Sequence, residues 1–200
     1  MRDGAGHKAD SEAVETGARG RRDAEGVSRA LVRPARPGDA AALVALAEAV
    51  GSEPEGWLIS ESRWRSVADE RRYLKAVRNH PDAAVFLAER DGEIVGRLSI
   101  SRDPHPASRH VADLGLMVAS SARRQGVGTA LLEQAVAWAH TTAVRKLELH
   151  VFPHNEPAIR LYERFGFVRE GYRKEQFRRG SGYVDAILMA YVVPAGDAGR

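Results

Sequence analysis

Hydrophobic residues recur along this chain with two different spacings, and these spacings predict its secondary structure. Alternation with a period of two, or a short apolar run, predicts a strand, whereas apolar residues three and four positions apart predict a helix. The predicted strands span Ala30–Arg33, Ala84–Glu89, Ile94–Ser101, Val111–Val118, Lys146–Phe152, Phe167–Phe177 and Tyr183–Val192. The predicted helices span Ala40–Val50, Ser60 or Ser62 to about Arg78, Val127–Thr141, and a last segment that Asn155 caps and Gly166 ends.

The connections between these segments predict how the strands pair. Asp91 and Gly92 form the kind of tight turn that closes a hairpin, and the three strands from 84 to 118 have short connections, so we expect an antiparallel meander. A helix separates strand 111–118 from strand 146–152, which predicts a parallel pair. The sequence therefore predicts an α/β fold with a mixed, mostly antiparallel sheet and one central parallel pair.

Side chains at two helix starts add detail to this prediction. Asp39 precedes the first helix and is expected to cap it, as Asn155 is expected to cap the last one, where Pro157 suits the first turn. The region between the first two helices and the second helix itself carry Trp57, Trp64 and Tyr73. These aromatic residues predict either a wall that faces a substrate or plain packing.

Composition narrows the class of protein. Lysine and arginine number 30 against 27 acidic residues, and this small excess of +3 is not gathered into a basic run, so nucleic acid is not an expected partner. The absence of cysteine excludes a disulfide scaffold, a thiolate metal site and a cysteine nucleophile. No apolar stretch approaches the roughly 20 residues that span a bilayer, and no secretory signal is visible, so we expect no membrane partner and a cytoplasmic location.

The two ends of the chain differ in composition from the rest. Residues 1–28 are rich in glycine, alanine and charge and hold no aromatic residue, which predicts a disordered tail. We therefore expect one domain over residues 29–193, with a short C-terminal tail at 194–200.

The turn from Arg123 to Gly128, Arg-Arg-Gln-Gly-Val-Gly, predicts an anion site. It lies between a strand and a helix, so free backbone N–H groups, the positive end of a helix dipole and two cationic side chains meet there. A dinucleotide fingerprint would need a third glycine where Leu131 stands, and the Gly-Lys-Ser/Thr end of a nucleotide-triphosphate loop is missing. The anion is thus expected to be a phosphate or pyrophosphate of another ligand.

A second motif identifies that ligand by resemblance. Residues 155–168, NEPAIRLYERFGFV, place Asn155 at the exit of a strand and Tyr162 seven residues later. Together with the Arg123–Gly128 turn, this resembles the GNAT family of N-acetyltransferases over about residues 30–193. The closing segment Val184–Tyr191 is similar to the ribosomal-protein alanine acetyltransferases of that family. The resemblance implies helices on both faces of the sheet and a parallel strand pair that splays apart.

The resemblance also implies acetyl-CoA as co-substrate, with no metal. Its pyrophosphate would contact the turn, its pantetheine arm would pair with the preceding strand, and Asn155 would hold that arm. The implied contacts are Leu116, Met117 and Val118 on the strand, then Arg123, Arg124, Gln125, Gly126, Val127, Gly128 and Thr129 in the turn. Glycine at 126 and 128 would let the backbone approach a phosphate closely. For Asn155 the alternative is a helix cap alone, and the two roles are compatible.

Three residues are candidates for proton transfer. Tyr162 matches the family's general acid, because a phenol can protonate a departing thiolate; its alternative is a core position beside Leu161 and Phe165. The amine must lose a proton before it attacks, and either Asp113 or His150 could accept it. Their alternatives are a solvated strand-end aspartate and a packed strand histidine, and a joint arrangement is also open.

These residues predict direct transfer of acetyl from acetyl-CoA to a primary amine, without a covalent enzyme intermediate. A main-chain N–H near Val118 would stabilise the oxyanion. The acceptor is left open between a protein N-terminus and a small-molecule amine, and a homodimer is possible. The rival from another class is a non-catalytic acyl-CoA sensor, which would not need Tyr162 or a base.

Overall fold

The structure, a computed structural model, describes residues 30–59 and 64–195. Its strands are β1 (Leu31–Pro34), β2 (Ala83–Arg90), β3 (Glu93–Arg102), β4 (Val111–Val118), β5 (Lys146–Val151), β6 (Val168–Arg179) and β7 (Gly182–Val192). Its helices are α1 (Ala40–Gly51), α2 (Val67–Val77), α3 (Val127–Thr141) and α4 (Glu156–Phe165). No helix in these described ranges is long and apolar enough to cross a membrane.

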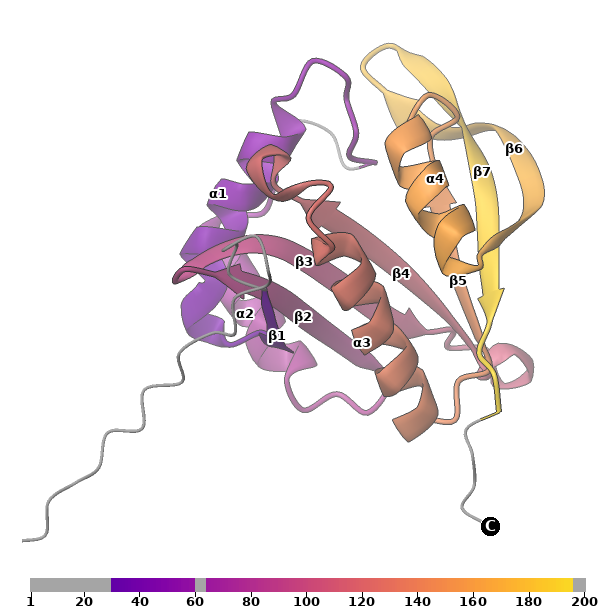
Figure 1. The fold of residues 1–200 in the computed structure, drawn as a ribbon, viewed down its shortest axis with the longest axis horizontal. Helices are drawn as coiled ribbons and strands as arrows, with labels where there is room; N and C mark the ends of the chain where they lie inside the picture. The colour runs from indigo at the N-terminus through magenta and orange to yellow at the C-terminus, as the bar shows by residue number, and fades with distance from the viewer. Residues whose placement is uncertain (1–29, 60–63, 196–200) are drawn as a thin grey trace, which may run out of the picture.

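The seven strands form one sheet in the order β1-β2-β3-β4-β5-β7-β6 (Figure 1). All neighbours are antiparallel except β4 and β5, which run parallel. This parallel pairing covers only Val111–Asp113 and Lys146–Glu148, after which the two strands diverge. The predicted mixed sheet is confirmed, and it is open at its centre.

Helices cover both faces of this sheet, because strand residues alternate between them. Leu98 packs with Leu131 of α3 in the larger core, on the face that α4 also covers. Leu87 packs with Leu43 of α1 and Leu74 of α2 on the opposite face. Figure 1 shows α3 and α4 in front of the sheet and α1 and α2 at its other side.

Two local predictions were wrong, and both failed at a helix start. α2 begins at Val67, where the Ser66 hydroxyl accepts the Asp69 N–H at 3.1 Å, so the predicted first turn is not helical at 64–66 and residues 60–63 lie outside the described part. The Asp39 side chain accepts no N–H from the first turn of α1, so the predicted cap is absent. A short 3-10 turn over Pro37–Asp39 directs its carboxylate back toward β1 instead.

The Asp39 carboxylate joins β1 to the start of α1. It accepts the Arg36 N–H at 2.7 Å and two guanidinium N–H groups of Arg33 at 2.8 and 2.9 Å. At the last helix the prediction is confirmed, since the Asn155 side chain accepts the Ala158 N–H. The predicted tails, 1–28 and 194–200, lie almost entirely outside the described residues, so the limits 29–193 stay a prediction.

Candidate active site

A cavity of about 880 Å³ occupies the opening between β4 and β5. On the α3–α4 face it is lined by residues such as Gly126 and Tyr162, and on the α1–α2 face by Trp57 and Trp64. Leu114 lies on the α3–α4 face of β4, and the adjacent Asp113, which points to the opposite face, also lines the cavity, so the cavity spans both faces of the sheet.

The predicted anion-binding turn, Arg123–Gly128, connects β4 to α3 through a left-handed backbone. Arg124 and Gly126 have φ angles of 63° and 77°, so the backbone passes through the left-handed region just before α3. No side chain caps the first turn of this 15-residue helix, which leaves N–H groups of that turn without an intrahelical partner, and Gly128 and Thr129 of the turn line the cavity. Arg124, Gly126, Gly128 and Thr129 all line the cavity.

Not every predicted turn residue offers its side chain to a ligand. The Arg123 guanidinium pairs with both carboxylate oxygens of Glu53 at 2.7 Å, and its Nε donates to the Val118 carbonyl at 3.1 Å. The Gln125 side chain bonds to Arg90 and to the Ser121 carbonyl. These side chains hold the loop in shape, so their part in binding would rest on the backbone.

Two apolar residues among the predicted contacts also direct their side chains into the protein core. The Val127 side chain is buried in the large core, and the Met117 side chain packs with α1 residues such as Val50. Gly128 also has a packing role, since a Cβ there would lie 2.7 Å from the Leu161 side chain of α4. The structure thus adds helix packing to phosphate approach as a reason for this glycine.

The strand edge of β4 provides main-chain groups for an extended ligand. After Asp113 the strand has no partner on its β5 side, whereas its other edge pairs with β3 up to Val118. The segment Leu116–Val118 lines the cavity along that open edge. The Val118 carbonyl already accepts from Arg123, and the other main-chain groups on this open edge suit a pantetheine arm, which carries amides of its own.

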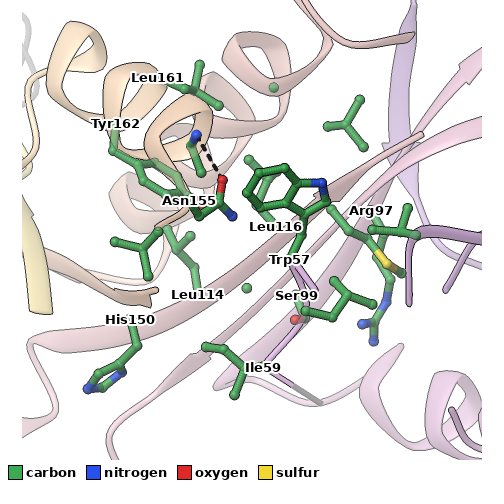
Figure 2. A pocket seen from close by; sticks show the side chains of 18 of the residues that line it. Trp57, Ile59, Arg97, Ser99, Leu114, Leu116, His150, Asn155, Leu161 and Tyr162 are labelled. Atoms are coloured by element: carbon green, nitrogen blue, oxygen red, sulfur yellow. Dashed lines mark hydrogen bonds between the residues drawn. The ribbon is translucent and has the colours of Figure 1, made fainter. Parts of the chain in front are cut away.

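Asn155 and Tyr162 approach the cavity from the α4 side (Figure 2). The Asn155 oxygen accepts the Ala158 N–H at 3.2 Å, which leaves its amide N–H groups for the cavity. Tyr162 is only 6% exposed, and its ring packs on Phe167 at 5.6 Å. Burial raises the pKa of Tyr162 well above its usual value, so the phenol keeps its proton at neutral pH.

Both candidate bases line the cavity on the α1–α2 face of the sheet, Asp113 from β4 and His150 from β5. The Asp113 side chain is open to the cavity, yet the surrounding walls partly desolvate it and Glu148 repels its charge. These effects outweigh the attraction of Arg173 and raise the pKa of Asp113 to about 6.

His150 is half-buried and has a different environment. Its ring meets the Phe177 ring edge-on at 5.7 Å, and its buried Nε2 has no hydrogen-bond partner among the described residues. Burial first, and then the Arg173 charge, lower the pKa of His150, against a smaller opposing effect of Glu148. The imidazole is therefore neutral at pH 7 and able to accept a proton.

The structure also brings in residues that sequence reasoning missed. Arg97 of β3 lines the cavity at 6% exposure, next to Glu70 of α2, which is fully buried. The sequence contains a signal for this residue, because Arg97 is a charged residue within an otherwise apolar run of strand β3. Trp57, Trp64 and Tyr73 line the cavity as well, which supports the substrate-facing alternative for these aromatics.

Comparison with known proteins decides which family this site belongs to. The model of the acetyltransferase (GNAT) family matches residues 51–167, more than half of the chain. The chain belongs to the GNAT family. This GNAT is 35% identical over 124 residues to the L-amino acid N-acetyltransferase AaaT of Escherichia coli K12, covering 62% of this chain and 76% of that protein. It is 40% identical over 68 residues to the [ribosomal protein bS18]-alanine N-acetyltransferase of E. coli K12, covering 34% and 46%.

Solved structures agree with this assignment. An acetyltransferase of the GNAT family from Streptococcus pneumoniae superposes with a TM-score of 0.74 at 29% identity, covering 82% of this chain and 99% of that one. The ribosomal-protein-alanine N-acetyltransferase of Brucella melitensis superposes with a TM-score of 0.71 at 28% identity, covering 81% and 99%. This GNAT is an N-acetyltransferase that uses acetyl-CoA as its acetyl donor. Among the described residues no group of three or more histidines, cysteines or acids could hold a metal ion.

Proposed function

We propose that the acceptor amine enters the cavity from the α1–α2 face, is deprotonated by Asp113 or His150, and attacks acetyl-CoA held on the α3–α4 face, where Tyr162 protonates the leaving thiolate. The observation that supports this most is the passage of one cavity through the sheet. It carries the candidate bases on one side and the candidate acid on the other.

The donor would bind along groups that the chain presents from its backbone. The uncapped start of α3 would take the pyrophosphate, with Arg124 as the cation that has no acidic partner in the described part of the chain. The open edge of Leu116–Val118 and the Asn155 amide would hold the pantetheine arm. Positioning of this kind supplies a large share of catalysis in a direct transfer.

The proton leaves the amine on the acceptor side. With a pKa of about 6, Asp113 is mostly ionised at pH 7 and still basic enough to take a proton. Neutral His150, with a free Nε2, is the second acceptor, and the two can act in one relay. The amine nitrogen then forms a bond to the carbonyl carbon as the C–S bond breaks, and the sulfur takes its proton from Tyr162.

The names of the relatives indicate the acceptor of this chain only at the level of a primary amine. One relative is named for L-amino acids and another for an alanine of ribosomal protein bS18. We accordingly propose a primary amine, either a small molecule or a protein N-terminus, as the acceptor of this chain.

Thiol release from acetyl-CoA with a panel of amines tests the proposal, with the N-acetylated product confirmed by mass. We expect Asp113→Asn and His150→Gln to reduce kcat/KM, with the larger loss at the principal base. His140→Gln, which removes an exposed histidine of α3 outside the cavity, is the matched control and should leave kcat/KM unchanged. Full activity in both Asp113→Asn and His150→Gln would contradict the assigned roles.

A further inference from the structure

The guanidinium of Arg97 is buried beside the cavity and lacks hydrogen-bond partners for some of its N–H groups within the described part of the chain. The residue is 6% exposed, lines the cavity, and its buried Nε has no hydrogen-bond partner. Among the described residues its nearest acid is Glu70, with Nη2 and Oε1 3.6 Å apart, which is too long for a hydrogen bond. A buried charged donor left unsatisfied is costly and calls for an explanation.

The charges around Arg97 are unbalanced. Glu70 is one buried carboxylate, and its Oε2 accepts from Arg65 and from the indole N–H of Trp64, both at 3.2 Å. Its Oε1 has no hydrogen-bond partner among the described residues and faces Arg97 Nη2 at 3.6 Å, so this acid and Arg97 form an ion pair without a hydrogen bond. Two arginines therefore share one acid, and the exposed Arg65 has the better hydrogen bond. Burial lowers the pKa of Arg97 below its usual range, in keeping with a cation that lacks sufficient compensation. The cluster has room for one more anion.

The position of Arg97 is next to the place where acetyl transfer would occur. In the β3–β4 register Arg97 lies opposite Met117, and Ser99 lies opposite Gly115. These residues share the face of the sheet that carries Asp113, because they are spaced by two along each strand. Two residues span about 7 Å along a strand, a distance that an arginine side chain can cover. An anion on Arg97 would thus lie close to an amine over Gly115.

Aromatic rings hold the guanidinium in place. Its Cζ lies 5.0 Å from the centroid of the Trp64 ring and 5.9 Å from that of Tyr73. Such stacking fixes the plane of the fork, and a fixed planar fork matches a carboxylate bidentately.

We propose that Arg97 binds a carboxylate adjacent to the acceptor amine, so that the acceptor is a free amino acid. This deepens the proposed function and rests on it. A protein N-terminus carries an amide where an amino acid carries this carboxylate, and it would leave Arg97 unsatisfied. Arg97 would bind and orient the acceptor without taking part in proton transfer.

Specificity ratios test this inference. The kcat/KM of a panel of L-amino acids is compared with that of their α-carboxamides and of a peptide that begins with alanine. We expect wild type to prefer the carboxylates and Arg97→Met to lower the carboxylate-to-carboxamide ratio at least tenfold, with Arg97→Lys in between. Each variant is measured on the same acceptor pairs, so intrinsic differences in amine reactivity cancel.

Arg65→Met is the matched control, since it removes the other cation that pairs with Glu70 but does not line the cavity. It should keep the wild-type ratio. Equal losses on both acceptors in Arg97→Met, or a wild type that prefers the peptide, would overturn the inference and leave Arg97 a packing role.

Calorimetry supplies a readout that needs no turnover and no variant. An N-acetyl amino acid should bind wild type in the presence of CoA at least tenfold more tightly than its carboxamide, and equal affinities would refute the carboxylate site. If wild type releases no thiol with any amine, the proposed function fails, whereas this comparison still decides the role of Arg97.

Discussion

Asp113 and Glu148 face each other as the last residue pair of the parallel β4–β5 ladder, directly before the two strands diverge. Two carboxylates at this point repel each other, and the repulsion adds to partial desolvation in raising the pKa of Asp113 to about 6. Lys146 bonds to Glu148 at 2.7 Å and to Glu170 at 2.6 Å, so the lysine stabilises Glu148 rather than Asp113. The end of the ladder thus places a weakly acidic carboxyl group where the cavity begins.

This pair predicts a shift of the pH–rate profile. Asp113 must be ionised to accept a proton, so kcat/KM should rise with pH through the pKa of Asp113. Glu148→Gln removes the like charge and should move this acid limb to lower pH by roughly half a pH unit. Glu170→Gln alters the other partner of Lys146 and should leave the limb in place. An acid limb unchanged by Glu148→Gln would contradict both candidate bases, because Glu148 also raises the pKa of His150. An acid limb that persists in Asp113→Asn would point to His150 as the base.

The same carboxyl group should affect stability. Its folded-state pKa is raised above the ordinary value near 3.9, so ionisation destabilises the fold, and stability is lost as pH rises from about 4 to 6. Asp113→Asn should therefore match wild type at pH 3.5 and exceed it at pH 8. Solvent in the cavity screens the charge, so we expect a gain of about 1 kcal/mol or less in urea unfolding. A variant less stable than wild type at pH 8 would contradict the repulsion.

Tyr162→Phe should lower kcat by roughly 10²-fold or more while acetyl-CoA still binds, because only the proton donor is lost. Stability should change little, since the Tyr162 hydroxyl has no hydrogen-bond partner among the described residues. Tyr191→Phe is the control: Tyr191 packs on Phe165 and Phe167 in the same aromatic cluster but does not line the cavity. An unchanged kcat in Tyr162→Phe would remove this residue from the mechanism.

Substitutions at two glycines with positive φ can distinguish the effect of backbone strain from an effect on acetyl-CoA binding. Gly126 has φ of 77° in the anion-binding turn, and Gly92 has φ of 83° in the β2–β3 turn, outside the cavity. Replacement by alanine should cost about 1–2 kcal/mol at each position. Only Gly126→Ala should also raise the KM for acetyl-CoA, measured by initial rates. A similar rise in Gly92→Ala would show that the effect is one of stability alone.

The sequence predicts the sheet and its parallel pair because the local signals agree. Strand periodicity, the Asp91-Gly92 turn and the Asn155 cap each act over a few residues, and the structure confirms the elements that they define. The predicted start of α2 was wrong because the sequence alone does not show which of Ser60, Ser62 and Ser66 caps the helix. Tertiary context selects Ser66, whose helix places Glu70 beside Arg97.

The partners of the site residues could not be predicted in the same way. Arg123 meets Glu53 across 70 positions of sequence, and Arg97 meets Glu70 because α2 packs on β2, the strand next to β3. Periodicity and motif spacing carry no information on such contacts. The motif predicts a binding turn at Arg123–Gly128, but only the structure shows that the Arg123 charge is already paired.

Direct acetyl transfer requires acetyl-CoA and the amine to be bound together in one cavity. Initial rates measured while both substrates are varied test this most directly, with thiol and N-acetyl product quantified in parallel. We predict intersecting double-reciprocal lines, equal amounts of thiol and N-acetylated amine, and no acetylated protein when acetyl-CoA is added alone. Parallel lines with an acetylated enzyme, or acetyl-CoA binding without product from any amine, would contradict direct transfer through the opening between β4 and β5.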